Sequence, residues 1–330
     1  MNNKLSIKDI ADKLKISKTT VSYIINGKAK QYRISKTLEK RVLDFVDEIK
    51  FIPNQVAQSL RTGKTNIIGL IVDDISNDFY ADIARCIEEK TFPQGFRLLY
   101  CSSENKLSKF KELTKLFRER QVDAYIVAPV TGCEENILSL INENKNLVLF
   151  DRYFKTIDTS YVTVQNSEGS YQATNLLIQK LYKHIGFVSL TSRQTVMVDR
   201  KAGYLKAMKE NRREPIVKEI AFNVHSDVYV EQLISFLEEN DQIDALFFSS
   251  SVLGVAGLQA IKQLKRKIPE DIAVICFDDH ILFRMYSPSI TVVAQPIEQI
   301  ADALIAIVAD NDKTTKQIVL PTSLLIRESV

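Results

Sequence analysis

Polar side chains that can donate hydrogen bonds crowd into one short stretch near the start of the chain, "ISKTTVSYIING" at residues 16–27. The apolar residues within it, Val21, Ile24 and Ile25, are spaced to share one face of a helix. A helix that buries this face leaves hydroxyls, an amine and a phenol facing outward, where they can donate to base edges and phosphates in a DNA major groove. The candidate DNA-contacting residues are Ser17, Lys18, Thr19, Thr20, Ser22, Tyr23 and Asn26.

The neighbouring stretches predict the helices that would position this one. Their apolar residues recur at helical spacing, at Ile7, Ile10, Ala11 and Leu14 before it and at Leu38, Val42, Phe45 and Ile49 after it. Ser6 and Asp9 have the spacing of a capping box, and Gly27 stands where glycine often ends a helix. Two helices with a short turn between them, followed by a third helix, form a helix-turn-helix. A small helical bundle with a solvated polar face is the alternative interpretation.

Basic residues are concentrated at the same end of the chain. Residues 1–65 contain 14 Lys or Arg and 6 Asp or Glu, a net charge of +8, whereas the whole chain has a net charge of only +3. A basic head on a mildly acidic body indicates that the head binds a polyanion. The stretch "GKAKQYRIS" at residues 27–35 is also rich in Lys and Arg, and it either contacts phosphates or forms a solvated loop.

From residue 66 onward, apolar runs alternate with amphipathic helical stretches such as residues 107–120. The runs are NIIGLIVDD, FRLLYCSS, DAYIVAPV and NLVLFD in a first series, then HIGFVSL, VKEIAFN, DALFFSS and DIAVICFDD in a second. This alternation predicts an α/β fold with doubly wound parallel sheets, and the two series predict two similar lobes. Ligands of such lobes bind at the carboxyl ends of the strands, across a cleft. The polar residues at these ends, which in each case could merely cap the next helix, are Asp73, Asp74, Asp151, Arg152, Asp278 and Asp279.

Several classes of protein are poorly supported by the sequence. The phosphate-binding patterns GxGxxG and GxxxxGK[ST] and the hydrolase pattern GxSxG are absent. The cysteines form no CxxC pair and the chain has only three histidines, so we expect neither a metal site nor a cofactor. The chain has no apolar run long enough for a membrane span and no apolar signal core, so we expect a cytoplasmic protein.

Three segments together resemble the lactose/galactose repressor family. They are "SIKDIADKLKISKTTVSYIING", "FIPNQVAQSLRTGKTNIIGLIV" at residues 51–72, and "PTSLLIRES" at residues 321–329. The likeness runs through the whole chain and implies two lobes of the periplasmic-binding-protein type behind the helix-turn-helix. It also implies that the helix beginning after Pro53 contacts the DNA minor groove, with Leu60 as a wedge between base pairs. The residues of this helix that match groove contacts are Asn54, Ala57, Leu60 and Arg61.

The resemblance also implies a set of effector-binding residues. The matching positions are Phe79, Arg200, Phe222, Asp278 and Gln295, and Asn166 and Ser250 are added as candidates from two stretches that differ from the family pattern. A sugar or sugar phosphate suits such a set, because paired hydroxyls suit an arginine with a carboxylate, and sugar rings stack on Phe. The chain departs from the family at Ser250-Ser251-Val252 and at Gln165-Asn166, which leaves a nucleobase or a co-repressor protein as alternative effectors. A further alternative is that Arg200 and Asp278 only pair with each other.

We therefore predict a sequence-specific transcription regulator, a repressor and not an enzyme, that binds a pseudo-palindromic operator as a homodimer. The expected domains are a DNA-binding domain at residues 1–50, a hinge-helix linker at 51–65 and an effector-binding domain at 66–330. Lobe 1 should combine about 66–164 with 293–320, and lobe 2 about 165–292 with 321–330. No heptad-repeat tail follows "LLIRESV", so a tail-mediated tetramer is not expected. The alternatives are a two-lobed sugar-binding protein and an α/β enzyme.

Overall fold

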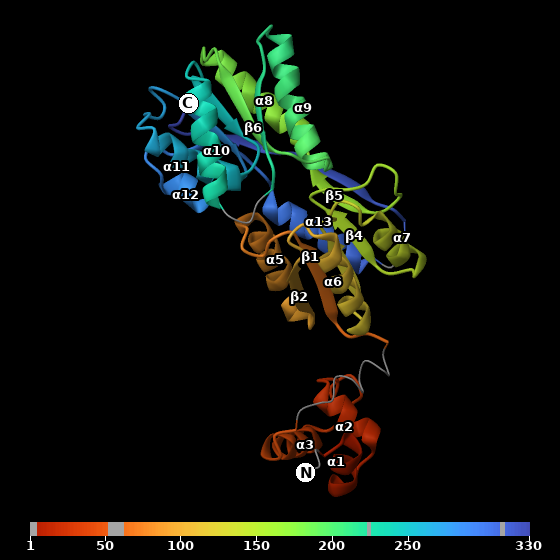
Figure 1. Cartoon of the computed structure of the whole chain (residues 1–330). Coiled ribbons are helices and arrows are strands. Elements are labelled where there is room, and N and C mark those ends of the chain that lie inside the picture. Colours follow the sequence, from red (N-terminus) through yellow and green to blue (C-terminus); the bar gives the residue numbers. More distant parts are fainter. Residues whose placement is uncertain (1–4, 52–62, 223–225, 311–313) are drawn as a thin grey trace. The chain divides into compact units, whose positions relative to one another are not determined.

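The computed structural model describes residues 5–51, 63–222, 226–310 and 314–330. The chain separates into two units, Met1–Thr65 and Asn66–Val330, which we call the head and the body (Figure 1). Among the described helices, none combines the length and the apolarity that crossing a membrane requires.

The head contains the helices that the sequence predicts: α1 (Ile7–Leu14), α2 (Lys18–Ile25) and α3 (Lys36–Glu48). The capping box at the start of α1 is confirmed, because Ser6 N donates to Asp9 Oδ2 at 2.7 Å and Asp9 N donates to Ser6 Oγ at 3.3 Å. Gly27 has a φ of +69°, a left-handed conformation that glycine adopts without strain just past a helix end. The three helices share one core, formed by Ile10, Ala11, Leu14, Val21, Ile24, Ala29 and Val42.

The first lobe of the body is a parallel sheet between two layers of helices. Its strands, in spatial order, are β11 (Gln317–Leu320), β5 (Tyr161–Val164), β4 (Leu147–Phe150), β3 (Ala124–Val127), β1 (Ile67–Val72) and β2 (Arg97–Ser102). Helices α5 (Asp78–Thr91) and α13 (Ile297–Ala309) share a core on one face of the sheet. Helices α6 (Leu107–Glu119) and α7 (Glu134–Asn142) share a core on the other face. The inner strands β1, β3 and β4 are apolar because both faces of the sheet are covered, whereas the edge strands β2 and β11 begin with the exposed residues Arg97 and Gln317.

The second lobe repeats this arrangement with one antiparallel edge strand. Its strands, in spatial order, are β12 (Ser323–Leu325), β10 (Thr291–Ala294), β9 (Ala273–Phe277), β8 (Ala245–Phe248), β6 (Ile185–Leu190) and β7 (Ile216–Ile220). Helices α8 (Asn166–Gln179) and α9 (Thr195–Glu210) cover one face. Helices α10 (Ser226–Glu239), α11 (Ser251–Gln263) and α12 (Ile281–Met285) cover the other. The α/β class, the two lobes and every strand predicted from an apolar run are confirmed.

The chain crosses between the lobes after β5, after β10 and after β11. The predicted crossing at residue 293 falls inside β10, because that strand continues its parallel ladder with β9 through Val293 and ends at Ala294. The last crossing leads into β12, which pairs antiparallel with β10. Beyond β12, Arg327 donates from both terminal nitrogens to the two carboxylate oxygens of Asp279, at 2.9 and 2.8 Å. Asp279, one of the polar residues predicted at strand ends, therefore anchors the segment that follows β12.

A close approach of α8 and α9 positions the polar residues of the second lobe. Gly203 lies on the face of α9 that meets α8, and a Cβ added there would lie 2.0 Å from the backbone oxygen of Ser167. Arg200 stands nearly one turn earlier on α9, and Asn166 is the first residue of α8. The absence of a side chain at residue 203 thus brings these two residues together.

We expect Gly203→Ala to lower the free energy of unfolding by about 1–3 kcal/mol, because a backbone atom cannot yield to the added methyl group as a flexible side chain can. The measurement is urea unfolding of the purified chain. Ala202→Ser, on the exposed side of the same turn, is the control and should stay within about 0.5 kcal/mol of the parent. Parental stability of Gly203→Ala would mean that the two helices are not held at this separation.

Candidate functional site

The exposed face of α2 is only partly free to contact another molecule. The Ser17 hydroxyl accepts from Thr20 N at 3.0 Å and lies 2.8 Å from the Thr20 hydroxyl, so both side chains help to begin the helix. At the other end, Asn26 Nδ2 donates to Ser22 O at 2.7 Å and to Ser22 Oγ at 3.3 Å. These interactions leave the exposed pair of the first turn, Lys18 and Thr19, projecting from the helix.

The remaining DNA-contacting candidates are Tyr23 and the four residues of the predicted hinge helix. Tyr23, on the last turn of α2, is partly buried, and its ring stacks on that of Tyr32. The candidates of the hinge helix, Asn54, Ala57, Leu60 and Arg61, lie outside the described residues.

Arg200 is the centre of a buried polar cluster in the second lobe. Its side chain donates from Nε to Asn166 Oδ1 at 2.8 Å and from Nη1 to Ser249 O at 2.6 Å. Its guanidinium also lies 3.6 Å from the Phe277 ring centroid, and Nη1 lies 3.6 Å from Asp278 Oδ2. Arg200 is only 2% exposed, so these partners replace the water that a buried cation loses.

Asp278 forms the other half of this cluster. Gln295 Nε2 donates to its Oδ1 at 2.6 Å. Burial raises the pKa of Asp278, whereas Arg200 and the hydrogen bond from Gln295 act in the opposite direction. The negative charge of Asp151 in the first lobe also raises the pKa of Asp278. The structure thus brings Asn166, Arg200, Asp278 and Gln295 together from α8, α9 and the ends of β9 and β10.

The other effector-binding candidates are Ser250, which borders the Arg200 cluster, and the phenylalanines Phe79 and Phe222. Ser250 follows β8 next to Ser249, and its Oγ is buried without a hydrogen-bond partner among the described residues. Phe79, in the first turn of α5, packs edge-on against Tyr80 with ring centroids 5.1 Å apart. Phe222 is 43% exposed beyond β7. Across the described ranges, no ring contact joins either phenylalanine to Arg200.

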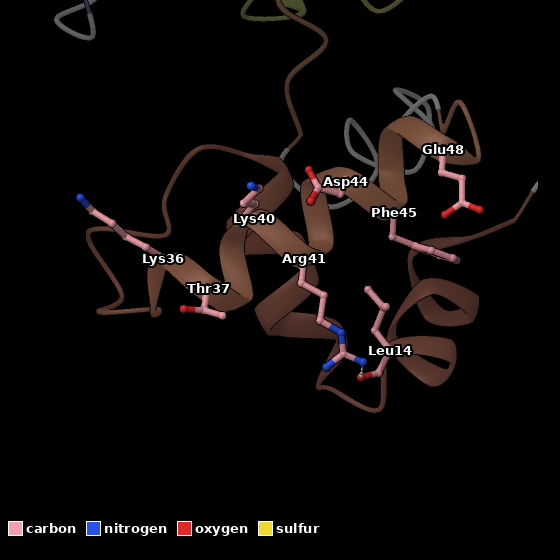
Figure 2. A pocket seen from close by; sticks show the side chains of 8 residues that line it. All are labelled: Leu14, Lys36, Thr37, Lys40, Arg41, Asp44, Phe45 and Glu48. Atoms are coloured by element: carbon pink, nitrogen blue, oxygen red, sulfur yellow. Dashed lines mark hydrogen bonds between the residues drawn. The ribbon is translucent and has the colours of Figure 1, made fainter.

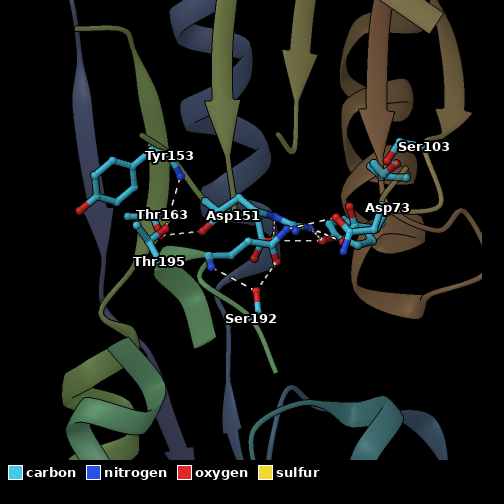
Figure 3. Close-up of polar contacts among 12 residues, drawn as sticks. Asp73, Ser103, Asp151, Tyr153, Thr163, Ser192 and Thr195 are labelled. Atoms are coloured by element: carbon cyan, nitrogen blue, oxygen red, sulfur yellow. Dashed lines mark hydrogen bonds and ion pairs between the residues drawn. The ribbon is translucent and has the colours of Figure 1, made fainter. Parts of the chain in front are cut away.

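A matching cluster in the first lobe joins Asp73, Asp151 and Arg152, which were predicted at strand ends but not among the effector contacts that the family resemblance implies. Arg152 pairs with Asp73, donates from Nε to Asp151 Oδ2 at 3.2 Å and from Nη2 to the Tyr80 hydroxyl at 2.9 Å. Tyr80 in turn donates to Asp151 Oδ2 at 3.0 Å. Figure 3 shows Asp73 and Asp151 within this network, at the ends of β1 and β4, two strands that β3 separates. The sequence signal was the position of these polar residues directly after strands, but spacing alone did not show that they meet.

Asp73 also has an unmet hydrogen-bonding capacity. Its Oδ1 is buried and has no partner among the described residues. Burial raises the pKa of Asp73, while the charge of Arg152 and its hydrogen bond act to lower it. Asp74, by contrast, accepts from the backbone and the hydroxyl of Ser76, both at 2.8 Å, and so has only a turn-forming role in this structure.

The two lobes meet along an interlobe cleft. His280 Nε2 lies 2.9 Å from Asp78 Oδ2, and Gln194 Nε2 donates to Asn105 Oδ1 at 3.2 Å. A cavity of about 450 Å³ opens beside Gln194, lined from the first lobe by residues such as Arg152 and Tyr153 and from the second by residues such as Thr195. The four residues of the Arg200 cluster do not line this cavity. Its volume lies in the range of small-molecule sites. Figure 3 shows Thr195 opposite Tyr153 at this boundary.

A second hollow, of about 650 Å³, lies on the head and has a different character. Figure 2 shows that side chains of α3 and Leu14 line it. Arg41 crosses it to donate to the backbone oxygen of Leu14 at 3.4 Å, at the end of α1. Most of its lining is charged and exposed, unlike the mainly apolar, enclosed sites that hold small molecules. Within the described ranges, no group of three or more His, Cys, Asp or Glu is placed to hold a metal ion.

Comparisons with known proteins match both units. Residues 6–54 match the model of "Bacterial regulatory proteins, lacI family". Residues 174–330 match that of "Periplasmic binding protein-like domain". The chain is 31% identical to the HTH-type transcriptional regulator RegA of Clostridium saccharobutylicum, over 98% of each chain. It is 28% identical to the ribose operon repressor of Halalkalibacterium halodurans, over 98% of this chain and 96% of that one.

The fold is also that of a solved structure. The crystal structure of the lac repressor dimer bound to operator and the anti-inducer ONPF aligns with a TM-score of 0.84, over 99% of both chains, at 17% identity. This likeness covers the order of the head and of both lobes along the chain.

Arg152→Met should lower the free energy of unfolding by about 3–5 kcal/mol at pH 7, because it leaves buried carboxylates without their cation. Without Arg152 the pKa of Asp73 rises further above its unfolded value, so the folded mutant binds a proton that the unfolded chain has released. The destabilisation should therefore shrink as the pH falls towards the ordinary carboxyl pKa of 3.8.

Urea unfolding of mutant and parent at pH 7.5 and at pH 5 measures this pH dependence. Arg120→Met, at an exposed arginine of the same lobe, is the control and should change stability by no more than about 0.5 kcal/mol. A loss for Arg152→Met that did not vary with pH would exclude the carboxylates as its cause.

Proposed function

Since the chain belongs to the lacI family of bacterial regulatory proteins, we propose that it represses transcription by binding an operator through α2, under the control of a small effector held between its lobes. The observation that carries the proposal is the combination of two features in one chain. The head presents a polar helix on a basic unit, and the body places buried charged side chains at the strand ends that border a cleft. The relatives are regulators, which does not favour an enzyme or a transport protein.

Operator binding follows from the head. The exposed pair Lys18 and Thr19 lies at the start of α2, where an amine and a hydroxyl can reach base edges together. Two heads are needed to bind a pseudo-palindromic site, so the chain acts as a homodimer. Its place of action is the cytoplasm, because that is where bacterial operator DNA lies. The proposed domains are residues 1–50 for DNA binding, 51–65 as the hinge and 66–330 for the effector.

The charges of the cleft favour a ligand that brings hydrogen-bond donors. The carboxylates Asp73, Asp151 and Asp278, with side chains 16%, 10% and 12% exposed, outnumber the two guanidiniums of Arg152 and Arg200. Asp73 Oδ1 remains without a donor among the described residues. The hydroxyls of a sugar supply such donors. We therefore propose a carbohydrate effector, contacted by Asp278, Gln295 and Asn166.

Control of DNA binding would come from closure of the cleft. A ligand that touches both lobes stabilises the arrangement in which they meet, as do the contacts from His280 and Gln194. The free energy of operator binding then changes by the difference between the ligand's binding free energies for the open and closed lobes. This difference is commonly about 1–3 kcal/mol. The proposed hinge, residues 51–65, would carry this change to the head, with Leu60 inserted in the minor groove.

Replacing Lys18 and Thr19 together by alanine should change which operator the chain prefers while leaving the fold intact. Loss of a good base contact should cost about 1–3 kcal/mol at the affected base pair. Selection from a randomised duplex library measures the preference. Lys8→Ala, at an exposed lysine of α1, is the control and should weaken all sequences alike. An unchanged preference in the double variant would remove this pair from the DNA-reading surface.

Asp278→Asn should reduce effector affinity at least tenfold, about 1.4 kcal/mol, because it removes a charged acceptor from the cleft. Operator binding without effector should be unchanged. A thermal-shift screen of sugars, sugar phosphates and nucleobases first identifies the effector, since a ligand that binds the folded state raises the unfolding temperature. Asp241→Asn, at an exposed aspartate of the same lobe, is the control.

Two results would contradict this assignment of Asp278. Parental effector affinity in the variant would show that Asp278 does not contact the ligand. Loss of operator binding in the absence of effector would show that the pair with Arg200 is structural only.

A further inference from the structure

We propose that Tyr32, in the loop that joins α2 to α3, is a positioning residue for DNA recognition that acts by fixing the ring of Tyr23. The proposal rests on the proposed function, in which the exposed face of α2 contacts the operator. It gives a role to the segment at residues 27–35, whose Lys and Arg content allowed either a phosphate contact or a solvated loop.

The two rings are stacked face to face. Their centroids are 3.6 Å apart and their planes differ by 3°. Tyr23 belongs to the last turn of α2, and its side chain is partly buried. Tyr32 remains 46% exposed, because one ring face covers Tyr23 while the rest of the side chain faces solvent. A ring held in this way has lost its side-chain freedom before DNA binds, so less entropy is lost on binding.

The loop is built to hold Tyr32 in place. Ala29 is 1% exposed and belongs to the core of the head, against which Ile34 also packs. Backbone hydrogen bonds close the loop on itself: Ile34 N donates to Ala29 O at 2.9 Å, and Tyr32 N donates to Lys28 O at 3.1 Å. Lys28 N donates in turn to Tyr23 O at 2.8 Å, which ties the loop to the residue that Tyr32 covers.

The charges around the stacked rings suit a position near phosphates. Lys28, Lys30 and Arg33 are exposed, and none of them pairs with a described acidic side chain. Arg33 has a positive φ of 52°, which turns the chain sharply directly after Tyr32. Each cation that neutralises a phosphate releases counterions, so its loss should flatten the dependence of affinity on salt.

A double-mutant cycle on the full chain tests whether Tyr32 acts through Tyr23. The DNA probe is the duplex that the parent selects from a randomised library, and an unrelated duplex of equal length measures non-specific binding. The variants are Tyr23→Ala, Tyr32→Ala and the combination of both, with Tyr32→Phe as the conservative variant that keeps the stacking. Lys30→Gln with Arg33→Gln tests the phosphate contact.

Tyr32→Ala should weaken binding to the selected duplex by roughly three- to tenfold, the range expected for loss of a stacked aromatic pair. It should also alter preference at the base pairs that Tyr23→Ala alters, and Tyr32→Phe should restore both. The combined variant should equal Tyr23→Ala alone, because two residues that act as one unit are not additive. The double glutamine variant should weaken both duplexes alike and reduce the salt slope by about 0.9 for each lost phosphate contact.

Three results would overturn the proposal: parental affinity and preference in Tyr32→Ala, additive losses in the combined variant, or an equal loss on both duplexes that Tyr32→Phe does not repair. The last would mean that Tyr32 only stabilises the head. An unchanged salt slope in the double glutamine variant would remove the phosphate contact. If the parent itself selects no preferred duplex, the proposed function fails; if it does and Tyr32→Ala behaves like the parent, only the role of Tyr32 fails.

Discussion

A guanidinium buried at the carboxyl edge of each sheet is the constraint on which the body depends. An arginine removed from water must find partners for its donors, or its desolvation destabilises the fold. Arg200 finds them in Asn166, a backbone carbonyl, Asp278 and the face of Phe277. The partners come from different helices and strand ends. The polar cluster can therefore form only when these elements pack as they do in the second lobe.

Both lobes place a buried arginine beside an aspartate, but the arginine comes from a different kind of element in each. In each, an aspartate with positive φ directly follows a strand, Asp151 after β4 with a φ of 65° and Asp278 after β9 with a φ of 73°. Arg152 comes from the same turn as Asp151, whereas Arg200 reaches Asp278 from a helix. A turn therefore places the arginine of the first lobe, whereas the arginine of the second lobe depends on the approach of α9 to α8 that Gly203 permits.

Local signals in the sequence predicted the helices and strands, whereas contacts between residues far apart in the sequence determine most of the geometry of the polar clusters. A capping box and a buried strand each depend on residues that are close in the sequence. The spacing of Ser6 and Asp9 and the apolar runs therefore predicted them correctly. Arg152 and Asp73 stand 79 positions apart, and no periodicity relates them. Tyr32 sits in a loop without periodicity, so its stacking on Tyr23 had no signal beyond composition. The Arg200–Asp278 cluster was anticipated only through a family resemblance.

The chain passes between the two lobes three times, and this affects how it can fold during synthesis. The head can form its core as soon as α3 has left the ribosome, because all of its described packing lies within the first unit. The body cannot follow in the same stepwise manner. β11 completes the first sheet and β12 the second, and both are made after almost everything else. During translation, therefore, a folded head would precede two unfinished lobes, each with an unpaired strand edge until β11 and β12 have been made.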